Sequence, residues 1–122
     1  MRIFIASADG ACRMALQLLL EGEPGMVVIG MSDRVEGLLT MMGASQPELL
    51  LLDHELTQQT TIQIIRDIHQ LKVQCKIIVL SIDPNIRELT LAAGADGFID
   101  KSYPPDELLT TLREIRLSSP LR

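Results

Sequence analysis

Short apolar runs alternate along this chain with longer stretches in which apolar residues recur at helical spacing. Two of the short runs, residues 49–52 and 77–80, are apolar at every position. Runs of that kind are typical of strands covered on both faces in a parallel sheet, so we expect these two near its centre. The pattern predicts five strands, at residues 3–7, 26–31, 48–53, 76–81 and 97–101.

Between and after the strands, the helical spacing predicts five helices. They cover residues 11–21, 35–43, 60–71, 84–93 and 105–117. The last one carries Asp106 and Glu107 in its first turn, where the helix dipole favours negative charge, and repeats Leu108 and Leu112 along one face. We expect that face to cover the sheet.

Five strand–helix units in succession predict an α/β fold with a doubly wound parallel sheet. Right-handed crossovers leave few topologies, and the five-stranded order 2-1-3-4-5 of the flavodoxin-like three-layer sandwich is the natural one. We expect one domain over residues 1–117, with 118–122 as a tail or the start of a linker. In such sheets, function gathers at the carboxyl ends of the strands.

Composition narrows the classes of function. Aromatic residues make up 2% of the chain and the net charge is −5 with both signs interspersed, which argues against direct nucleic-acid binding by this domain. No apolar run approaches the length of about 20 residues that a membrane span needs, so we expect a cytoplasmic protein. Cys12 and Cys75 lack metal-ligand spacing, and we interpret them as reduced, small apolar residues.

Polar residues collect where the predicted strands end. Strand one ends at Ser7, strand three at Asp53, strand four at Ser81 and strand five at Lys101. A carboxylate, a hydroxyl and an ammonium group, those of Asp53, Ser81 and Lys101, are thereby predicted to meet at one edge of the sheet.

This joint pattern resembles the response-regulator receiver family over essentially the whole chain. The resemblance is carried by residues 92–101, by the third strand ending in Asp53 and by the fourth ending in Ser81; residues 20–25 are also similar to receivers that precede helix-turn-helix output domains. It implies that Asp53 accepts a phosphoryl group from a histidine kinase or phosphotransfer protein, that Ser81 and Lys101 contact that group, and that Phe98 swings inward with Ser81. It implies no enzymatic activity beyond this.

The family also binds Mg²⁺ through an acidic pair after strand one, and here the sequence departs from the pattern. Ser7 and Ala8 stand where the acids should be. The candidate metal ligands are therefore Asp53 and two replacements: Asp9, one position late, and Glu55, which we expect on the same strand face as Asp53. Mg²⁺ binding is doubtful with this set.

Two further departures affect the same region. Ile82 should crowd the space beside Ser81, because a β-branched side chain stands where the family carries a very small residue. The loop over residues 54–60 lacks the usual Met-Pro-Gly turn, and Lys101 is followed by Ser102 in place of proline.

Three functions remain open. The first is a receiver with Asp53 as a working phosphoacceptor; the second is a phosphorylation-independent pseudo-receiver that acts through partner binding or dimerisation, which the departures favour. The third is a flavodoxin-like electron carrier, although the chain lacks a hydroxyl-rich phosphate loop and aromatics to hold a flavin. We expect a homodimer or output contact through residues 86–93, 98–99 and 108–115, and an output domain outside this chain. His54 and His69 are interpreted as bystanders.

Overall fold

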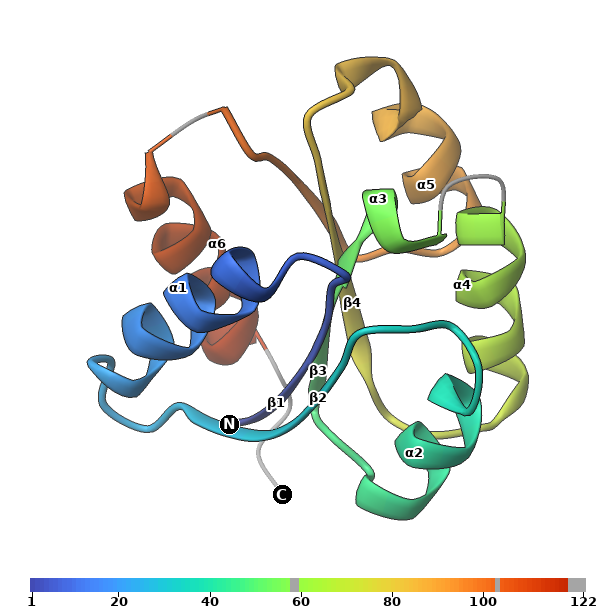
Figure 1. The fold of residues 1–122 in the computed structure, drawn as a ribbon, viewed down its shortest axis with the longest axis horizontal. Coiled ribbons are helices and arrows are strands. Elements are labelled where there is room, and N and C mark those ends of the chain that lie inside the picture. The colour runs from blue at the N-terminus through green and yellow to red at the C-terminus, as the bar shows by residue number, and fades with distance from the viewer. Residues whose placement is uncertain (58–59, 103, 119–122) are drawn as a thin grey trace.

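The computed structural model describes residues 1–57, 60–102 and 104–118, and it forms a parallel sheet between two layers of helices (Figure 1). The sheet has five strands in the order β2-β1-β3-β4-β5, which confirms the predicted topology. The strands are β1 (Arg2–Ala6), β2 (Val27–Ser32), β3 (Leu49–Asp53), β4 (Lys76–Ser81) and β5 (Gly97–Asp100). All five residues of β3 are buried, as a central strand requires.

The helices are α1 (Gly10–Glu21), α2 (Leu38–Ser45), α3 (His54–Thr57), α4 (Thr61–Gln70), α5 (Arg87–Ala93) and α6 (Pro105–Ser118). A 3₁₀ turn at Pro84–Ile86 precedes α5, and the Asp83 side chain caps it by accepting a hydrogen bond from the backbone N–H of Asn85. The helix predicted over residues 84–93 therefore begins as this tighter turn. None of the helices in the described residues has the length and apolar character needed to cross a membrane.

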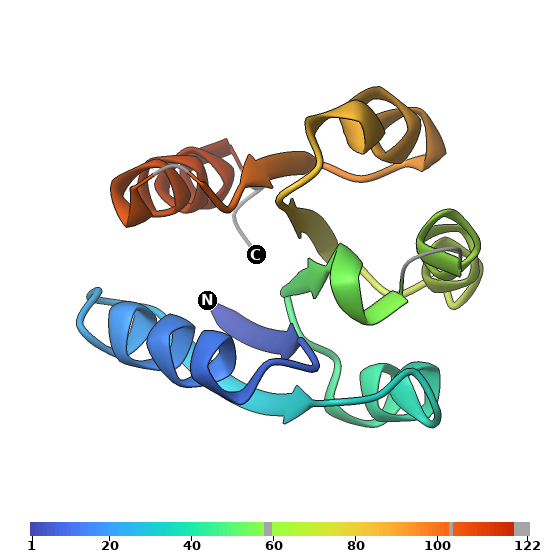
Figure 2. The ribbon, with the colours of Figure 1, turned by 45° about the horizontal axis from the view of Figure 1, so that its top comes forward.

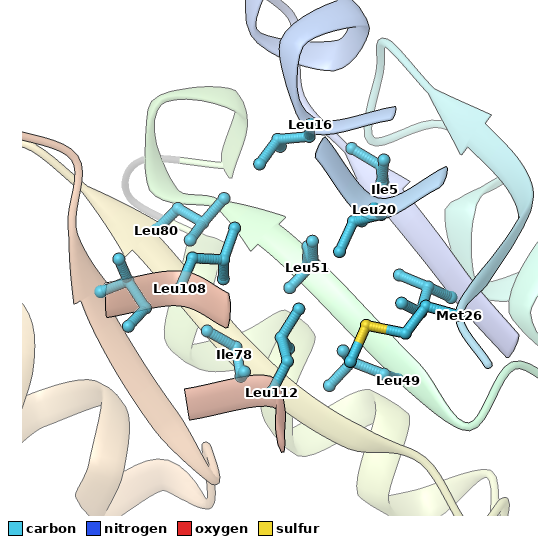
Figure 3. Packing of buried hydrophobic residues seen from close by; sticks show 12 residues of the cluster. Ile5, Leu16, Leu20, Met26, Leu49, Leu51, Ile78, Leu80, Leu108 and Leu112 are labelled. Carbon is cyan, nitrogen blue, oxygen red and sulfur yellow. The ribbon is translucent and has the colours of Figure 1, made fainter. Parts of the chain in front are cut away.

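Two apolar clusters hold the layers together. Helices α1 and α6 cover one face of the sheet, and α2, α4 and α5 lie on the other (Figure 2). In the first cluster, Leu16 and Leu20 of α1 meet Leu108 and Leu112 of α6 over the apolar residues of β3 and β4 (Figure 3). The stripe predicted on the last helix is confirmed as its buried face.

Helix α3 is the element that the sequence did not predict. Residues 54–57 were expected to form a loop, with Glu55 continuing the strand face of Asp53. The chain instead turns into a helix directly after Asp53, so Glu55 lies in its first turn and the strand-face prediction is wrong. Four residues are too few to display a helical period, which is why no pattern revealed it.

Candidate functional site

The register of the sheet brings the polar strand ends together. In the pairing of β1 with β3, Ala6 lies opposite Leu52, so the residues that follow, Ser7 and Asp53, end beside each other. Lys101 follows β5 and donates its backbone N–H to the carbonyl of Ser81 at 2.9 Å. The three predicted strand ends are thus at one edge, and Ser7 joins them.

Asp53 is the centre of this cluster and is 1% exposed. Its Oδ2 accepts a hydrogen bond from Ser7 Oγ at 2.7 Å, and its Oδ1 accepts one from the backbone N–H of Glu55 at 3.0 Å. Lys101 Nζ lies 3.1 Å from each of the two oxygens. A carboxylate has about four lone-pair sites, so these four hydrogen bonds satisfy all of them.

These contacts set the protonation state of the pair. Burial by itself raises the pKa of Asp53, but hydrogen bonds from Glu55, Ser7 and Lys101 outweigh it and lower the pKa below its usual value. Burial likewise opposes the charge of Lys101, whereas Asp53 and Glu55 raise its pKa above the ordinary lysine value. The pair is therefore ionised at neutral pH.

The side chain of Glu55 contacts two members of the site, the Ile82 backbone and Lys101. Its Oε1 accepts a hydrogen bond from the backbone N–H of Ile82 at 3.2 Å, and its Oε2 lies 3.6 Å from Lys101 Nζ. Glu55 therefore links the chain segments that follow β3, β4 and β5.

Ser81 and Phe98 occupy different places around the cluster. Ser81 is fully buried, and its Oγ accepts a hydrogen bond from the backbone N–H of Asp83 at 3.0 Å. Phe98 is partly buried and packs against the apolar cluster under α2 and α4. Ile82 is 66% exposed, and it contacts the site through its backbone N–H, which donates to Glu55 Oε1. The crowding expected beside Ser81 stays a prediction.

Asp9, one of the two candidate metal ligands added to Asp53, is engaged elsewhere. Its Oδ1 accepts hydrogen bonds from the backbone N–H groups of Ala11 and Cys12, so it caps the start of α1 from an exposed position. The Mg²⁺ that the family resemblance implies needs oxygen atoms with free lone pairs. Those of Asp53 are all taken, Glu55 faces Lys101, and no group of three His, Cys, Asp or Glu side chains within the described residues could hold a metal ion. The donor set in this arrangement does not fit Mg²⁺.

Three residues near the cluster were not singled out for their contacts. Ser7 was read as a missing acid, yet it is a fully buried donor to Asp53. Arg13 donates from Nη1 to the carbonyl oxygen of Ser7 at 2.7 Å and so helps to fix it. Cys12 lies near Ser7 and Asp53, and burial raises the pKa of its thiol. A hydroxyl at the end of β1 was the available signal, because the predicted strand order already placed β1 beside β3.

The site is charged, but it is closed in the sense that every Asp53 lone pair is engaged in a hydrogen bond. A carboxylate attacks phosphorus with a lone pair, and each lone pair of Asp53 already accepts a hydrogen bond. Transfer also depends on neutralising the charge of the incoming group, and the ammonium of Lys101 is shared by two carboxylates. The geometry favours a stable internal network over an open nucleophile.

Comparison with known proteins places this chain in a family. The family model of the response regulator receiver domain matches residues 3–113. The transcriptional regulatory protein DesR of Bacillus subtilis is 27% identical over 115 residues, which are 93% of this chain and 57% of that protein. The cell cycle transcriptional regulator CtrA of Caulobacter vibrioides is 26% identical over 119 residues, 94% of this chain and 50% of that protein.

Among solved structures, the isolated REC domain of RcsB from Salmonella enterica serovar Typhimurium, in the presence of phosphomimetic BeF3−, is similar in fold. Its TM-score is 0.87 at 20% sequence identity, covering 99% of this chain and 91% of that chain. The present chain spans about half the length of the curated relatives it matches.

Proposed function

Since the chain belongs to the response-regulator receiver family, we propose that it acts in two-component signalling as an atypical receiver domain. Its output follows from partner binding or dimerisation, and phosphorylation of Asp53 is slow or absent. Membership of this family also replaces the electron-carrier alternative.

The observation that carries the proposal is the hydrogen bond from Ser7 Oγ to Asp53 Oδ2, at 2.7 Å. A hydroxyl stands where the family carries an acid, so Ser7 donates a hydrogen bond to Asp53 and supplies no negative charge for a cation. Mg²⁺ would supply charge neutralisation to phosphoryl transfer when bound. Without the acidic pair that would hold this cation, phosphoryl transfer to Asp53 loses its main source of charge neutralisation.

A second candidate function, a working phosphoacceptor, is favoured by one feature of the same site. Asp53 and Lys101 keep a direct ion pair, and Ser81 stays buried at the end of the neighbouring strand. In that reaction an Asp53 oxygen would bond to phosphorus while the bond from phosphorus to the donor atom breaks, and the leaving group would take the electron pair. Ser7 would first have to release the attacking oxygen.

The proposed partners follow from the relatives. DesR and CtrA are named as transcriptional regulators, so we place a DNA-binding output domain outside residues 1–117, which form the receiver unit, with residues 118–122 leading toward it. A sensor histidine kinase or phosphotransfer protein is the upstream partner, and the cytoplasm is the compartment. The domain itself binds no nucleic acid and has no further enzymatic activity.

The partner or homodimer surface is proposed at the β5 edge of the sheet. Helices α5 and α6 flank β5 there, one on each face. Leu89 of α5 is 63% exposed, which supplies an apolar contact residue on this surface.

The test is phosphoryl transfer to the purified chain. The protein is incubated with Mg²⁺ and acetyl phosphate, which would release acetate, and the intact mass is followed beside Asp53→Asn. We expect no gain of mass from one phosphoryl group in either protein, with both showing a cooperative thermal transition. A gain in the wild-type chain that Asp53→Asn lacks would overturn the proposal and establish the second candidate.

A further inference from the structure

Glu55 makes more contacts than its place in a short helix requires. Its backbone N–H donates to Asp53, its Oε1 accepts from the N–H of Ile82, and its Oε2 lies 3.6 Å from Lys101 Nζ. Oε2 is also buried and has no hydrogen-bond partner among the residues that the structure describes. Glu55 Oε2 is thus buried away from water, and the contact that it makes in the described residues is the ion pair with Lys101.

A phosphoryl group on Asp53 would need the same contacts. Its oxygens would lie about one P–O bond beyond the carboxylate, and they would require a cation and N–H donors within hydrogen-bond distance. Lys101 Nζ, 3.1 Å from both Asp53 oxygens, is the cation within reach, and the Ile82 N–H lies on the neighbouring strand end. Glu55 already holds both.

The charges of the cluster lead to the same conclusion. Asp53 and Glu55 carry two negative charges and Lys101 carries one positive charge, so the cluster has one uncompensated negative charge. A phosphoryl group would add further negative charge where the ammonium is already shared between two carboxylates. Like charges in a partly desolvated site repel each other strongly.

We propose that the Glu55 carboxylate is a built-in anion that occupies the position a phosphoryl group on Asp53 would need. It holds Lys101 and the Ile82 N–H in an anion-bound arrangement without phosphorylation. This inference rests on the proposed function and deepens it, because it gives the receiver fold a fixed state from which to bind its partner.

The contacts of Glu55 also affect the proposed partner surface, because they fix the segment that leads from β4 to α5. Glu55 fixes the backbone directly after β4, where Ser81 Oγ accepts from the N–H of Asp83 and Asp83 caps the 3₁₀ turn leading into α5. Helix α5 forms one side of that surface. Glu55 is therefore a positioning residue whose effect is transmitted through the loop between β4 and α5.

The first test measures the Ile82 amide in Glu55→Met. This change removes the acceptor with little change in side-chain length, and we expect the Ile82 amide to exchange with solvent about tenfold faster than in the wild-type chain. The matched control is Glu36→Met, because Glu36 is exposed and lies outside the site and the proposed partner surface. Unchanged Ile82 exchange in Glu55→Met, with both variants folded, would overturn the inference.

The second test measures labelling by acetyl phosphate in a background with the acidic pair restored, Ser7→Asp with Ala8→Asp. Adding Glu55→Gln to this background should speed labelling about tenfold or more, since it frees Lys101 and removes one negative charge. Adding Glu36→Gln should leave the rate unchanged. Equal rates with and without Glu55→Gln would refute the built-in anion.

The two proposals fail separately. Labelling of the unmodified chain at Asp53 would overturn the proposed function, whatever Glu55 does. Unchanged Ile82 exchange would overturn the role of Glu55 even where the unmodified chain takes no label.

Discussion

At the scale of single residues, the Ser7 hydroxyl is the feature that most affects how the site is interpreted, because it donates a hydrogen bond to Asp53. The sequence identified Asp53, Ser81 and Lys101 from their places at strand ends, and it identified Ser7 only as the loss of an acid. Its donation to Asp53 is a matter of side-chain direction and distance, which strand order does not specify. For Ile82, the sequence shows the size of the side chain but not its exposure, which is 66% in the structure.

Replacing Ser7 by alanine should destabilise the protein by about 1–2 kcal/mol, because a buried carboxylate oxygen loses one of its donors. Urea unfolding at neutral pH measures this change. The matched control is Ser45→Ala, whose hydroxyl donates to the Met41 carbonyl at an exposed site and should cost less than about 0.5 kcal/mol. Equal losses in the two variants would remove Ser7 from the proposed network.

At the scale of elements, the hydrophobic pattern predicted the strands and helices that are long enough to display a strand or helix period. All five strands and the five longer helical segments were found, with ends displaced by at most a few residues. Helix α3 was missed because it has four residues, and its position decides where Glu55 points. A second local feature was also invisible: the register of β1 against β2 shifts between Ile3 and Phe4, so that Phe4 pairs with Gly30.

The surroundings of two glycines, Gly30 opposite Phe4 and Gly43 in α2, predict opposite effects of a Gly→Ala change on stability. In Gly30→Ala the added carbon would lie 2.7 Å from the Phe4 ring, in a tightly packed region, so we expect a loss of about 1–3 kcal/mol. Gly43 lies within α2 with nothing within 4 Å of the added carbon, and Gly43→Ala should raise stability by about 0.5–1 kcal/mol. Thermal unfolding of both variants checks the signs, and a neutral Gly30→Ala would contradict the register of β2.

At the scale of the whole molecule, the alternation of strands and helices was sufficient to predict the fold class and the strand order. The closed state of the site was not predictable, because it depends on how the charges at the ends of β3 and β5 balance in a buried place. Asp53 is buried, Lys101 is partly buried, and Glu55 completes the cluster. This balance makes the stability of the whole domain depend on pH.

The stability should fall at both extremes of pH. The lowered pKa of Asp53 contributes stability that is present above the ordinary carboxyl pKa of about 4 and is lost as the pH falls through the folded-state value. The raised pKa of Lys101 contributes stability that is present below about pH 10.4 and is lost as the pH rises through its folded-state value. Urea unfolding across pH, compared with Asp53→Asn, should show a shallower acid limb in the variant. Identical acid limbs would contradict the assignment.

The most direct measurement of the central claim compares phosphoryl labelling of the wild-type chain and of Ser7→Asp with Ala8→Asp, side by side, with acetyl phosphate and Mg²⁺. Restoring the two acids supplies the missing charge beside Asp53, so we predict labelling of the double variant at a rate at least about tenfold above that of the wild-type chain. Asp53→Asn in the restored background should abolish it. A wild-type chain that is labelled at Asp53 as fast as the restored variant would contradict the account, because Ser7 would then be no obstacle to phosphorylation.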